Sequence, residues 1–450
     1  MTPSRIVPEL LAPSSIVVAG GSNSLQKPGG KILYNLLRGS YKGRVYVLNP
    51  NESDVQGVKS YNSPGELPPV ELAIIVIPAG MSVDTVRKLA DKGTRAFIVI
   101  SAGFSEEGEA GAELERELVR ITESVNGTLI GPNCIGLINL NYQAVFTTPI
   151  PKLSPDGCEL ISGSGATAVF IMESGIPKGL GFAAVYSVGN SAMIGVEDIL
   201  EHMDHTFDIH SSPGIKLLYI ESIKDPDKLL RHASSLIRKG CRIAAIKAGS
   251  SEAGSRAAFS HTGAMVSSDL AVEALFRKAG IVRCHGREEL TTIASIFMQK
   301  KLKGRRIAIV THAGGPAVML TDALTGGGIQ IPRIEGKDAD ELLSKLKPGS
   351  SVANPIDILA TGSPEQLGMA IDYCDTRFDN IDAIMVIFGS TGLSDVYEVY
   401  ELIHDKIRKC SKPVYPILPS LSSAKNEMEK FLQLGHINFP DEVVLANALN

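Results

Sequence analysis

Short apolar runs rich in β-branched residues recur along the whole chain, and each is followed by a glycine-rich turn and then by a helical pattern. Runs of this kind are typical of strands that helices cover on both faces, and their alternation with helices predicts parallel sheets. The runs form three series: SSIVVAG, RVYVLNP, LAIIVIP, AFIVISAG and GTLIGPN; then CELISGSG, FAAVYSVGN, IKLLYIES, RIAAIKAG and GIVRCHG; then RIAIVTHAGG, IQIPRI, AIMVIFGS and PVYPILPS. The sequence therefore predicts an α/β protein of three doubly wound parallel-sheet domains, at residues 1–148, 149–300 and 301–450. The three series share a topology rather than an obvious sequence repeat.

The size and charge of the chain narrow the classes of function. A chain of 450 residues is too long for one hydrophobic core, and its net charge of −5 gives no reason to expect a nucleic-acid or anionic-membrane partner. The N-terminus lacks the apolar core of a signal peptide, and apolar runs such as LAIIVIPAG are too short to span a bilayer. The cysteines are scattered without a CxxC pair, so we expect free thiols in the cytoplasm and no metal site. They are Cys134, Cys158, Cys241, Cys284, Cys374 and Cys410.

The first series contains a turn that suits a nucleotide-like ligand. In open sheets of this class, ligands bind beyond the carboxyl ends of the strands. After the first strand, Gly20 and Gly21 allow close approach of the backbone, and the following helix offers free N–H groups to a phosphate. The glycine spacing does not fit GxGxxG, and no clear acidic residue closes the second strand. A dinucleotide-dependent dehydrogenase stays an alternative at this point.

The other strand ends of the first series also carry small or turn-forming residues, in PNESD, PAGMS, SAGFSEEG and GPNCIG. Together they predict a crevice lined by backbone amides. Such a crevice would suit a pyrophosphate-bearing ligand with a long tail.

The second series places a histidine at the same edge of its sheet. The segment KAGSSEAGSRAAFSHTGAMVSSD is expected to form a long exposed loop with His261 near its end. A neutral histidine is nucleophilic near pH 7 and can accept a phosphoryl group. Glu221, at the end of KLLYIES, could orient the ring or could serve as an ion-pair partner, and the pattern alone leaves both open. In ISGSGATAV the amides of Ser164, Gly165 and Ala166 would form an anion site at a helix N-terminus.

Five motifs follow one another along the chain: GPNCIGLIN, SGSGA, SVGN, SHTGA and AGGPAVM. In this order they resemble the motifs of the NDP-forming acyl-CoA synthetases, relatives of succinyl-CoA synthetase. The resemblance runs from about residue 10 to the C-terminus. It implies a Rossmann-like CoA-binding domain followed by two flavodoxin-like ligase domains, with His261 as the phosphorylated residue and Glu221 as its orienting carboxylate.

The resemblance also implies the residues that contact the ligands. Phosphate would meet Ser164, Gly165, Ala166, Gly314 and Gly315. Coenzyme A would meet Gly20, Gly21, Ser22, Asn23, Pro50, Pro78, Ser101, Gly103, Phe104 and Asn133. The chain departs from the family at Asn51, where many relatives have a lysine for the CoA phosphate, and the candidates to replace that lysine are Lys27 and Lys31. This chain has SGSG where the family usually has SQSG. It has KAGSSEAG where the family has KSGRTEAG, so an arginine near the phosphate is absent.

The activity that the resemblance implies is the interconversion of acyl-CoA, phosphate and ADP with a carboxylic acid, CoA and ATP, through an acyl phosphate and a phosphohistidine. The family's ATP-grasp nucleotide module is missing, so we expect a separate β subunit that carries it with Mg²⁺, in a heterotetramer of two of each. A piece of a longer fused polypeptide would look identical. The alternative is a catalytically inactive CoA-binding regulatory protein, which need not keep His261 and Glu221. The sequence identifies neither the acid nor ADP over GDP.

Overall fold

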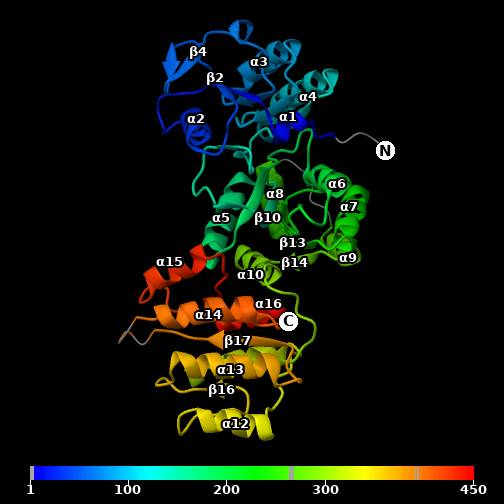
Figure 1. The fold of residues 1–450 in the computed structure, drawn as a ribbon. Helices are drawn as coiled ribbons and strands as arrows, with labels where there is room; N and C mark the ends of the chain where they lie inside the picture. The colour runs from blue at the N-terminus through cyan, green and yellow to red at the C-terminus, as the bar shows by residue number, and fades with distance from the viewer. Residues whose placement is uncertain (1–4, 263–267, 391, 393–394) are drawn as a thin grey trace. The chain divides into compact units, whose positions relative to one another are not determined.

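The computed structural model describes residues 5–262, 268–390, 392 and 395–450. The chain forms two compact units, Met1–Glu173 with Gly181–Leu290, and Ser174–Leu180 with Thr291–Asn450. The first unit holds two seven-stranded sheets and the second unit holds one four-stranded sheet (Figure 1). None of the helices in the described part of the chain has both the length and the apolar character needed to cross a membrane.

The first sheet has the strand order β3-β4-β2-β1-β5-β6-β7, with only β3 antiparallel to its neighbour. Its strands are β1 (Ser15–Ala19), β2 (Arg44–Leu48), β3 (Asp54–Val55), β4 (Val58–Tyr61), β5 (Leu72–Ile75), β6 (Ala96–Val99) and β7 (Thr128–Ile130). Its helices are α1 (Pro8–Leu11), α2 (Pro28–Arg38), α3 (Ala79–Asp91) and α4 (Glu109–Ser124). Every side chain of β1, β5, β6 and β7 is buried, as the continuous apolar runs predict for strands covered on both faces. All five strands predicted from the first series are confirmed.

The second sheet has the order β14-β13-β12-β10-β11-β8-β9. Its strands are β8 (Gly136–Ile138), β9 (Gln143–Val145), β10 (Leu153–Ser162), β11 (Phe182–Ser187), β12 (Ile215–Ile220), β13 (Arg242–Lys247) and β14 (Val282–Cys284). The helices among and after them are α5 (Gly165–Gly175), α6 (Val196–Thr206), α7 (Pro226–Arg238), α8 (Glu252–Thr262), α9 (Asp269–Ala279) and α10 (Arg287–Phe297). The five predicted strands form, and the hairpin β8–β9 adds to β11 in antiparallel fashion. The sheet is therefore mixed, and two of its strands precede residue 148 of the expected domain division.

The third sheet has the order β16-β15-β17-β18, with all pairs parallel. Its strands are β15 (Ile307–Thr311), β16 (Ile356–Asp357), β17 (Ala383–Ile387) and β18 (Val414–Ile417). Its helices are α11 (Gly314–Gly326), α12 (Lys337–Lys345), α13 (Pro364–Thr376), α14 (Tyr397–Lys409), α15 (Lys425–Gln433) and α16 (Glu442–Leu449). The run IQIPRI was wrongly predicted as a strand, since it forms only a single bridge at Gln330. Pro332 in this run has no N–H to donate to a ladder, and β16 pairs with β15 further along.

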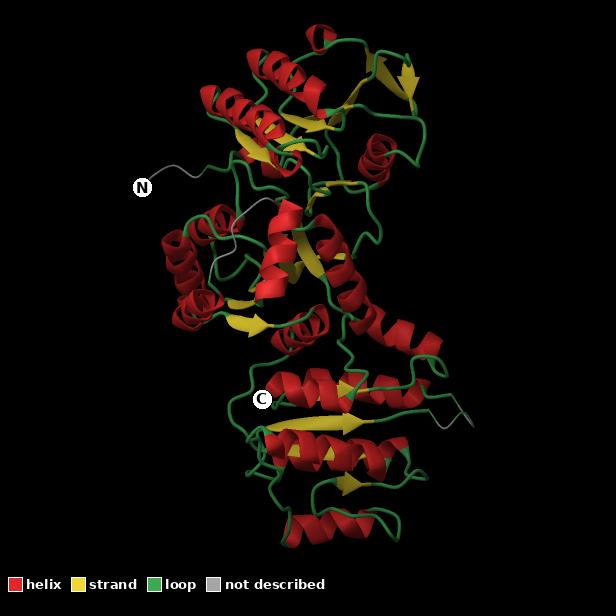
Figure 2. Cartoon of the chain, turned by 180° about the vertical axis from the view of Figure 1, so that it is seen from behind, coloured by secondary structure: helices red, strands yellow, loops and turns green. Residues whose placement is uncertain are grey.

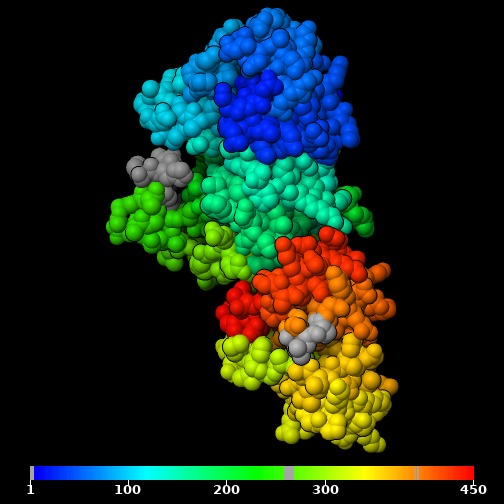
Figure 3. Space-filling model, turned by 90° about the vertical axis from the view of Figure 1, so that its left-hand side faces the viewer, coloured from blue at the N-terminus to red at the C-terminus, as the bar shows by residue number. Residues whose placement is uncertain are grey.

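Helices cover the strands of each sheet (Figure 2), and side chains fill the space between the ribbons within each unit (Figure 3). Helix starts follow local chemistry. Asp225 accepts from the backbone N–H of Lys228 at the start of α7 (2.9 Å), and Ser363 and Gln366 form a reciprocal capping box at α13.

The chain order reverses between β1 and β5 in the first sheet and between β10 and β12 in the second. At such a reversal, the two neighbouring loops leave the sheet in opposite directions and open a crevice at the carboxyl ends. Both of these reversals lie in the first unit, and the candidate site lies at both of them. The third sheet reverses between β15 and β17, in the second unit.

Candidate functional site

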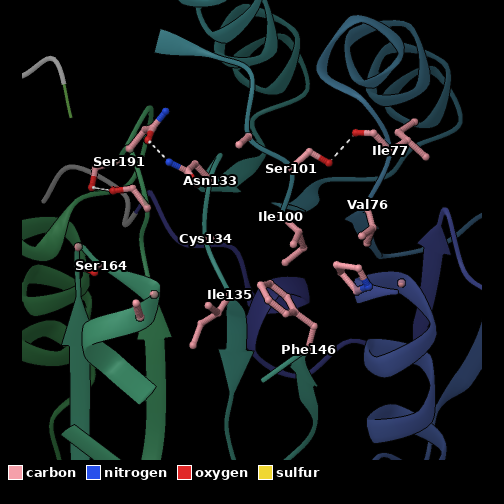
Figure 4. Close-up of a pocket in the computed structure, with 18 of the residues that line it drawn as sticks. Val76, Ile77, Ile100, Ser101, Asn133, Cys134, Ile135, Phe146, Ser164 and Ser191 are labelled. Atoms are coloured by element: carbon pink, nitrogen blue, oxygen red, sulfur yellow. Dashed lines mark hydrogen bonds between the residues drawn. The ribbon is translucent and has the colours of Figure 1, made fainter. Parts of the chain in front are cut away.

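A cavity of about 660 Å³ lies in the first unit, where the carboxyl ends of strands from both sheets meet (Figure 4). This volume is within the usual range for a small-molecule or cofactor site. The lining residues are Gly20, Lys27, Pro28, Gly29, Val76, Ile77, Pro78, Ile100, Ser101, Ala102, Asn133, Cys134, Ile135, Phe146, Gly163, Ser164, Gly165, Ala166, Gly189, Asn190, Ser191, Val196, Glu221 and Ser222.

The turn between β1 and α2 forms one wall from backbone alone. Gly20 has φ +91°, and an added Cβ there would lie 2.5 Å from the carbonyl oxygen of Val76. An added Cβ at Gly29 would lie 2.1 Å from the carbonyl oxygen of Gly20. Glycine is therefore required at both positions, because no side chain fits between the turn, the helix and β5. Lys27, directly before α2, is the cation of this wall.

Ser101 and Asn133 follow β6 and β7 and face the cavity (Figure 4). The Ser101 hydroxyl donates to the carbonyl of Ile77, which holds two strand ends together. Asn133 adopts a left-handed conformation with φ +57° and donates its side-chain amide to Asn190 Oδ1 at 3.3 Å. A ligand at this edge would meet groups whose orientation is already set by the protein.

Asn190 links the first-sheet loops to the second-sheet loops. Its amide nitrogen also donates to Ser105 Oγ (3.2 Å), Glu115 Oε2 (3.0 Å) and the Glu106 carboxylate. Burial acts to raise the pKa of Glu106, but the hydrogen bonds from Asn190 and from backbone amides outweigh it, so the pKa is lowered. The ionised carboxylate therefore fixes the SAGF turn beside the cavity.

The turn between β10 and α5 forms the opposite wall. The Ser162 hydroxyl donates to the carbonyl of Ser164 (2.6 Å), and the Ser164 hydroxyl accepts from Thr167 N–H (3.3 Å). These bonds set the first turn of α5, whose N–H groups at Gly165 and Ala166 have no partner within the helix. Such a helix start attracts anions through its dipole.

Glu221 follows β12 and lies next to that turn, since an added Cβ at Gly163 would be 3.6 Å from Glu221 Cγ. β13 pairs with β12, and Lys247 at the end of β13 is buried. Burial lowers the pKa of Lys247, while the carboxylates of Asp269 and Glu221 act in the opposite direction. Acidic and basic groups thus meet beside the anion-attracting end of α5.

His261 lies in α8, which spans Glu252–Thr262, so the expected long loop is wrong for this stretch. Glu252 and Arg256 form an i,i+4 ion pair (2.8 Å) on its exposed side, which is typical of helix. The His261 side chain lies outside the described residues, so its position relative to Glu221 stays a prediction.

The cavity brings together eight of the residues predicted from the sequence. They are Gly20, Pro78, Ser101, Asn133, Ser164, Gly165, Ala166 and Glu221. Six predicted CoA contacts do not line it, namely Gly21, Ser22, Asn23, Pro50, Gly103 and Phe104.

Three of these six residues make contacts within the protein, and their contact with CoA stays a prediction. Asn23 bonds to the backbone of Asp54 and Gln56, Gly103 N–H donates to Glu106, and Phe104 is fully buried. Gly314 and Gly315 begin α11 and belong to the second unit.

The apolar part of the wall was not foreseen from the sequence. Ile100, Cys134, Ile135 and Phe146 line it (Figure 4). Burial raises the pKa of Cys134 to about 12, so its thiol stays protonated and is not a nucleophile near neutral pH. Phe146 gave no signal because it follows the β8–β9 hairpin, which the strand pattern missed. Asn190 was visible only as part of SVGN.

Comparisons with known proteins place these features in a class. Residues 14–139 match the family described as CoA binding domain, and residues 155–297 match the Succinyl-CoA ligase like flavodoxin domain. The chain therefore combines a CoA-binding domain with a flavodoxin-like ligase domain.

Individual relatives define the family. The chain is 38% identical over 387 residues to the Acetate–CoA ligase [ADP-forming] II subunit alpha of Pyrococcus furiosus, covering 85% of this chain and 83% of that one. It resembles the solved dinucleotide forming acetyl-coenzyme A synthetase 1 of Ca. Korarchaeum cryptofilum, in complex with phosphate and ADP, with a TM-score of 0.87 and 27% identity, covering 99% of this chain and 96% of that one. The chain belongs to the family of ADP-forming acyl-CoA synthetases, which are acid–thiol ligases.

Some relatives are longer. The chain is 33% identical over 404 residues to Acetate–CoA ligase [ADP-forming] I of Archaeoglobus fulgidus, covering 89% of this chain but only 57% of that protein. The match thus accounts for little more than half of that relative.

Proposed function

We propose that this chain binds CoA thioesters in the cavity of the first unit and transfers a phosphoryl group to His261, as one subunit of an ADP-forming acyl-CoA synthetase. One observation carries the proposal: the first-sheet turn at Gly20 and the anion-attracting turn at Ser164 face the same cavity, beside Glu221. A thioester and a phosphate must meet for the first step, and this arrangement offers a place for both.

The two proposed steps depend on how the protein positions the thioester, the phosphate and His261, and need no reactive cofactor. Phosphate oxygen attacks the thioester carbonyl, and CoA leaves as its thiolate, which gives an acyl phosphate. The neutral nitrogen of His261 then attacks phosphorus, and the carboxylate leaves. The amides of Gly165 and Ala166 would stabilise the phosphate oxygens, and Glu221 would orient the imidazole.

The second half-reaction requires a nucleotide. We propose that ADP and Mg²⁺ bind on a β subunit with an ATP-grasp module, in a cytoplasmic heterotetramer of two of each subunit. The names of several relatives as alpha subunits support a partner. Gly314 and Gly315, at the start of α11, would offer a further anion site in the second unit.

The CoA phosphate also needs a cation, and Lys27 lines the cavity whereas Lys31 does not. Lys31 lies one turn into α2, with its ammonium 5.3 Å from the centre of the Tyr34 ring. Of the two candidates for the missing family lysine, Lys27 is the one that we propose. Replacing Lys27 with alanine should weaken CoA binding, and the same change at Lys31 is the matched control.

The test is the intact mass of the purified chain after incubation with acetyl-CoA and phosphate at neutral or alkaline pH, since phosphohistidine is acid-labile. We expect a gain of one phosphoryl group that is absent in His261→Ala. Protein that binds CoA but gains no phosphoryl group from acetyl-, propionyl-, succinyl- or aryl-acetyl-CoA, even with a β subunit present, would favour the inactive CoA-binding regulator.

A further inference from the structure

Helices α6 and α7 pack against each other in the first unit (Figure 1). This packing brings together three side chains of types that can bind a metal ion. Glu201 and His205 are four residues apart on α6 and therefore share one face of that helix. His232 comes from the middle of α7. One carboxylate oxygen and two imidazole nitrogens of these residues lie within 4.8 Å of one another.

The ring of His232 is the observation that indicates a ligand. Its side chain is 5% exposed, and Nδ1 lies 2.8 Å from Asp204 Oδ2. Because an ionised carboxylate can only accept, Nδ1 carries a proton and donates it. The other nitrogen, Nε2, is buried without a hydrogen-bond partner among the described residues, and Glu201 Oε1 is 3.6 Å away. His232 Nε2 and Glu201 Oε1 thus face each other across a gap that is too wide for a hydrogen bond.

We propose that Glu201, His205 and His232 bind one divalent transition-metal ion of the zinc class. Two imidazoles and a carboxylate are a common protein donor set for such ions, with water in the remaining position. The hydrogen bond from His232 to Asp204 is the support that a metal-ligating histidine usually has, because it fixes the tautomer and exposes the Nε2 lone pair.

The geometry requires a small closure. Bonds of about 2.0–2.2 Å to zinc place tetrahedral ligand atoms roughly 3.4 Å apart, so the present spread of up to 4.8 Å must shrink by up to about 1.4 Å. His205 is exposed and can adjust. Lys228 contacts Glu201 through Oε2 (3.1 Å), which leaves Oε1 on the side of His232.

The local charge favours a cation. Along this face of α6, Asp198, Glu201 and Asp204 supply three carboxylates, whereas the lysines paired with them are Lys228 and Lys239, so three minus two leaves one negative charge. The carbonyl end of α6 adds to it, since a helix C-terminus attracts positive charge. A bound ion would fasten the last turns of α6 to α7. The other end of α6, at Val196, lines the cavity.

The test uses the full chain freed of metal by a chelator and dialysed without nucleotide. We expect about one equivalent of Zn²⁺ to bind with a rise in melting temperature, and Co²⁺ to give a visible spectrum of nitrogen and oxygen ligation without thiolate charge transfer. His205→Ala and Glu201→Gln should each weaken Zn²⁺ binding at least about 10-fold, and Asp204→Asn should weaken it about 10-fold.

The matched control is His210→Ala, because His210 is exposed and outside the cluster. It should leave Zn²⁺ binding unchanged, and circular dichroism should show His205→Ala folded as the parent. Two results would overturn the proposal: no stoichiometric binding of Zn²⁺ or Co²⁺, or binding that survives both His205→Ala and Glu201→Gln. Either would leave an imidazolium of His232 paired with Glu201 as the account of the buried nitrogen.

Discussion

The turns after β10 and β15 belong to different units and share no obvious sequence repeat, yet they are built alike. In the first, the Ser162 hydroxyl donates to the carbonyl of Ser164 and accepts its N–H. In the second, the hydroxyl of Thr311 makes the same two bonds with Ala313. A helix begins directly after each of these pairs of hydrogen bonds, α5 after the first and α11 after the second.

An acidic residue stands at the end of a neighbouring strand in both cases. Glu221 adjoins the first turn, with its Cγ 3.6 Å from an added Cβ at Gly163. Asp357 adjoins the second turn, with Oδ2 at 3.6 Å from an added Cβ at Gly314. The hydroxyl bonds, the acid at the neighbouring strand end and the glycine that begins the helix recur, but the residues between them differ, which explains why the likeness is not evident from the sequence.

The two turns differ in what surrounds them. Ser164 caps α5 with its side chain and lines the cavity, while Ala313 offers no side-chain cap to α11. An added Cβ at Gly165 would meet Ile135 Cγ2 at 2.4 Å, while at Gly314 it would have only ordinary contacts. The same turn geometry therefore forms part of a cavity wall after β10, where the helix start is closely packed, and a loosely packed helix start after β15.

The largest difference should appear between the two acids. Glu221→Gln should slow phosphorylation of the chain by acetyl-CoA and phosphate about 100-fold, because a neutral amide stabilises the imidazolium-like state less well. The matched Asp357→Asn should change that rate less than about 3-fold. Quenched-flow mass spectrometry measures both phosphorylation rates. An equal loss of rate in the two variants would mean that the two acids do not differ in function.

The two helix-start glycines should differ in stability. Gly165→Ala forces a shift of Ile135 and should lower the free energy of unfolding by about 2 kcal/mol. Gly314→Ala should change it by less than about 0.5 kcal/mol, since its Cβ would make only ordinary contacts. Urea denaturation followed by circular dichroism gives both values, and a harmless Gly165→Ala would contradict the packing argument.

The caps can be exchanged. Ser164→Ala should cost about 1 kcal/mol through loss of the bond to Thr167 N–H, and Ala313→Ser should gain about 0.5 kcal/mol by adding the missing cap. Thermal unfolding measures both, with melting temperatures moving in opposite directions. Melting temperatures that move in the same direction would mean that the side chain at this position does not cap the two helices in the same way.

The smallest effect concerns the next position. Gly315→Ala adds a Cβ with no heavy atom within 4 Å and should stabilise by about 0.5 kcal/mol, while Ala166→Gly should destabilise by a similar amount. Denaturant midpoints suffice to detect both. If Gly315 contacts phosphate through its backbone, the stabilised variant should keep its activity with the β subunit, because alanine retains the N–H.

The sequence predicted the strands that are continuous apolar runs, because burial on both faces leaves a plain signal. It missed β8 and β9, three residues each, whose place in the second sheet depends on pairing with a distant strand. It also took the segment with His261 for a loop, because glycine and serine outweighed the helix-forming Ala257 and Arg256.

The site was predictable where the strand-end rule applies. Gly20, Ser101 and Glu221 were found in this way, and the structure places all three on the cavity. Phe146 was missed, and Asn190 was seen only within the SVGN motif, because both reach the cavity from loops that only the folded chain brings near. No spacing rule could indicate His232, because the burial of its Nε2 without a hydrogen-bond partner among the described residues depends on the packing of α6 against α7.

The thiol of Cys134 in the cavity wall has a consequence for oxidative damage. The ligand of the matching CoA-binding family ends in a thiol, and oxidation converts that thiol to a disulfide of CoA. Attack of a protein thiolate on this disulfide would release one CoA thiolate and leave the other CoA in a mixed disulfide with the chain. Disulfide exchange requires a thiolate, and Cys134 is buried, with its pKa raised to about 12 and its Sγ donating to the Val99 carbonyl. Only a trace of Cys134 thiolate exists at neutral pH, so the cavity wall can lie beside a disulfide of CoA without forming the mixed disulfide.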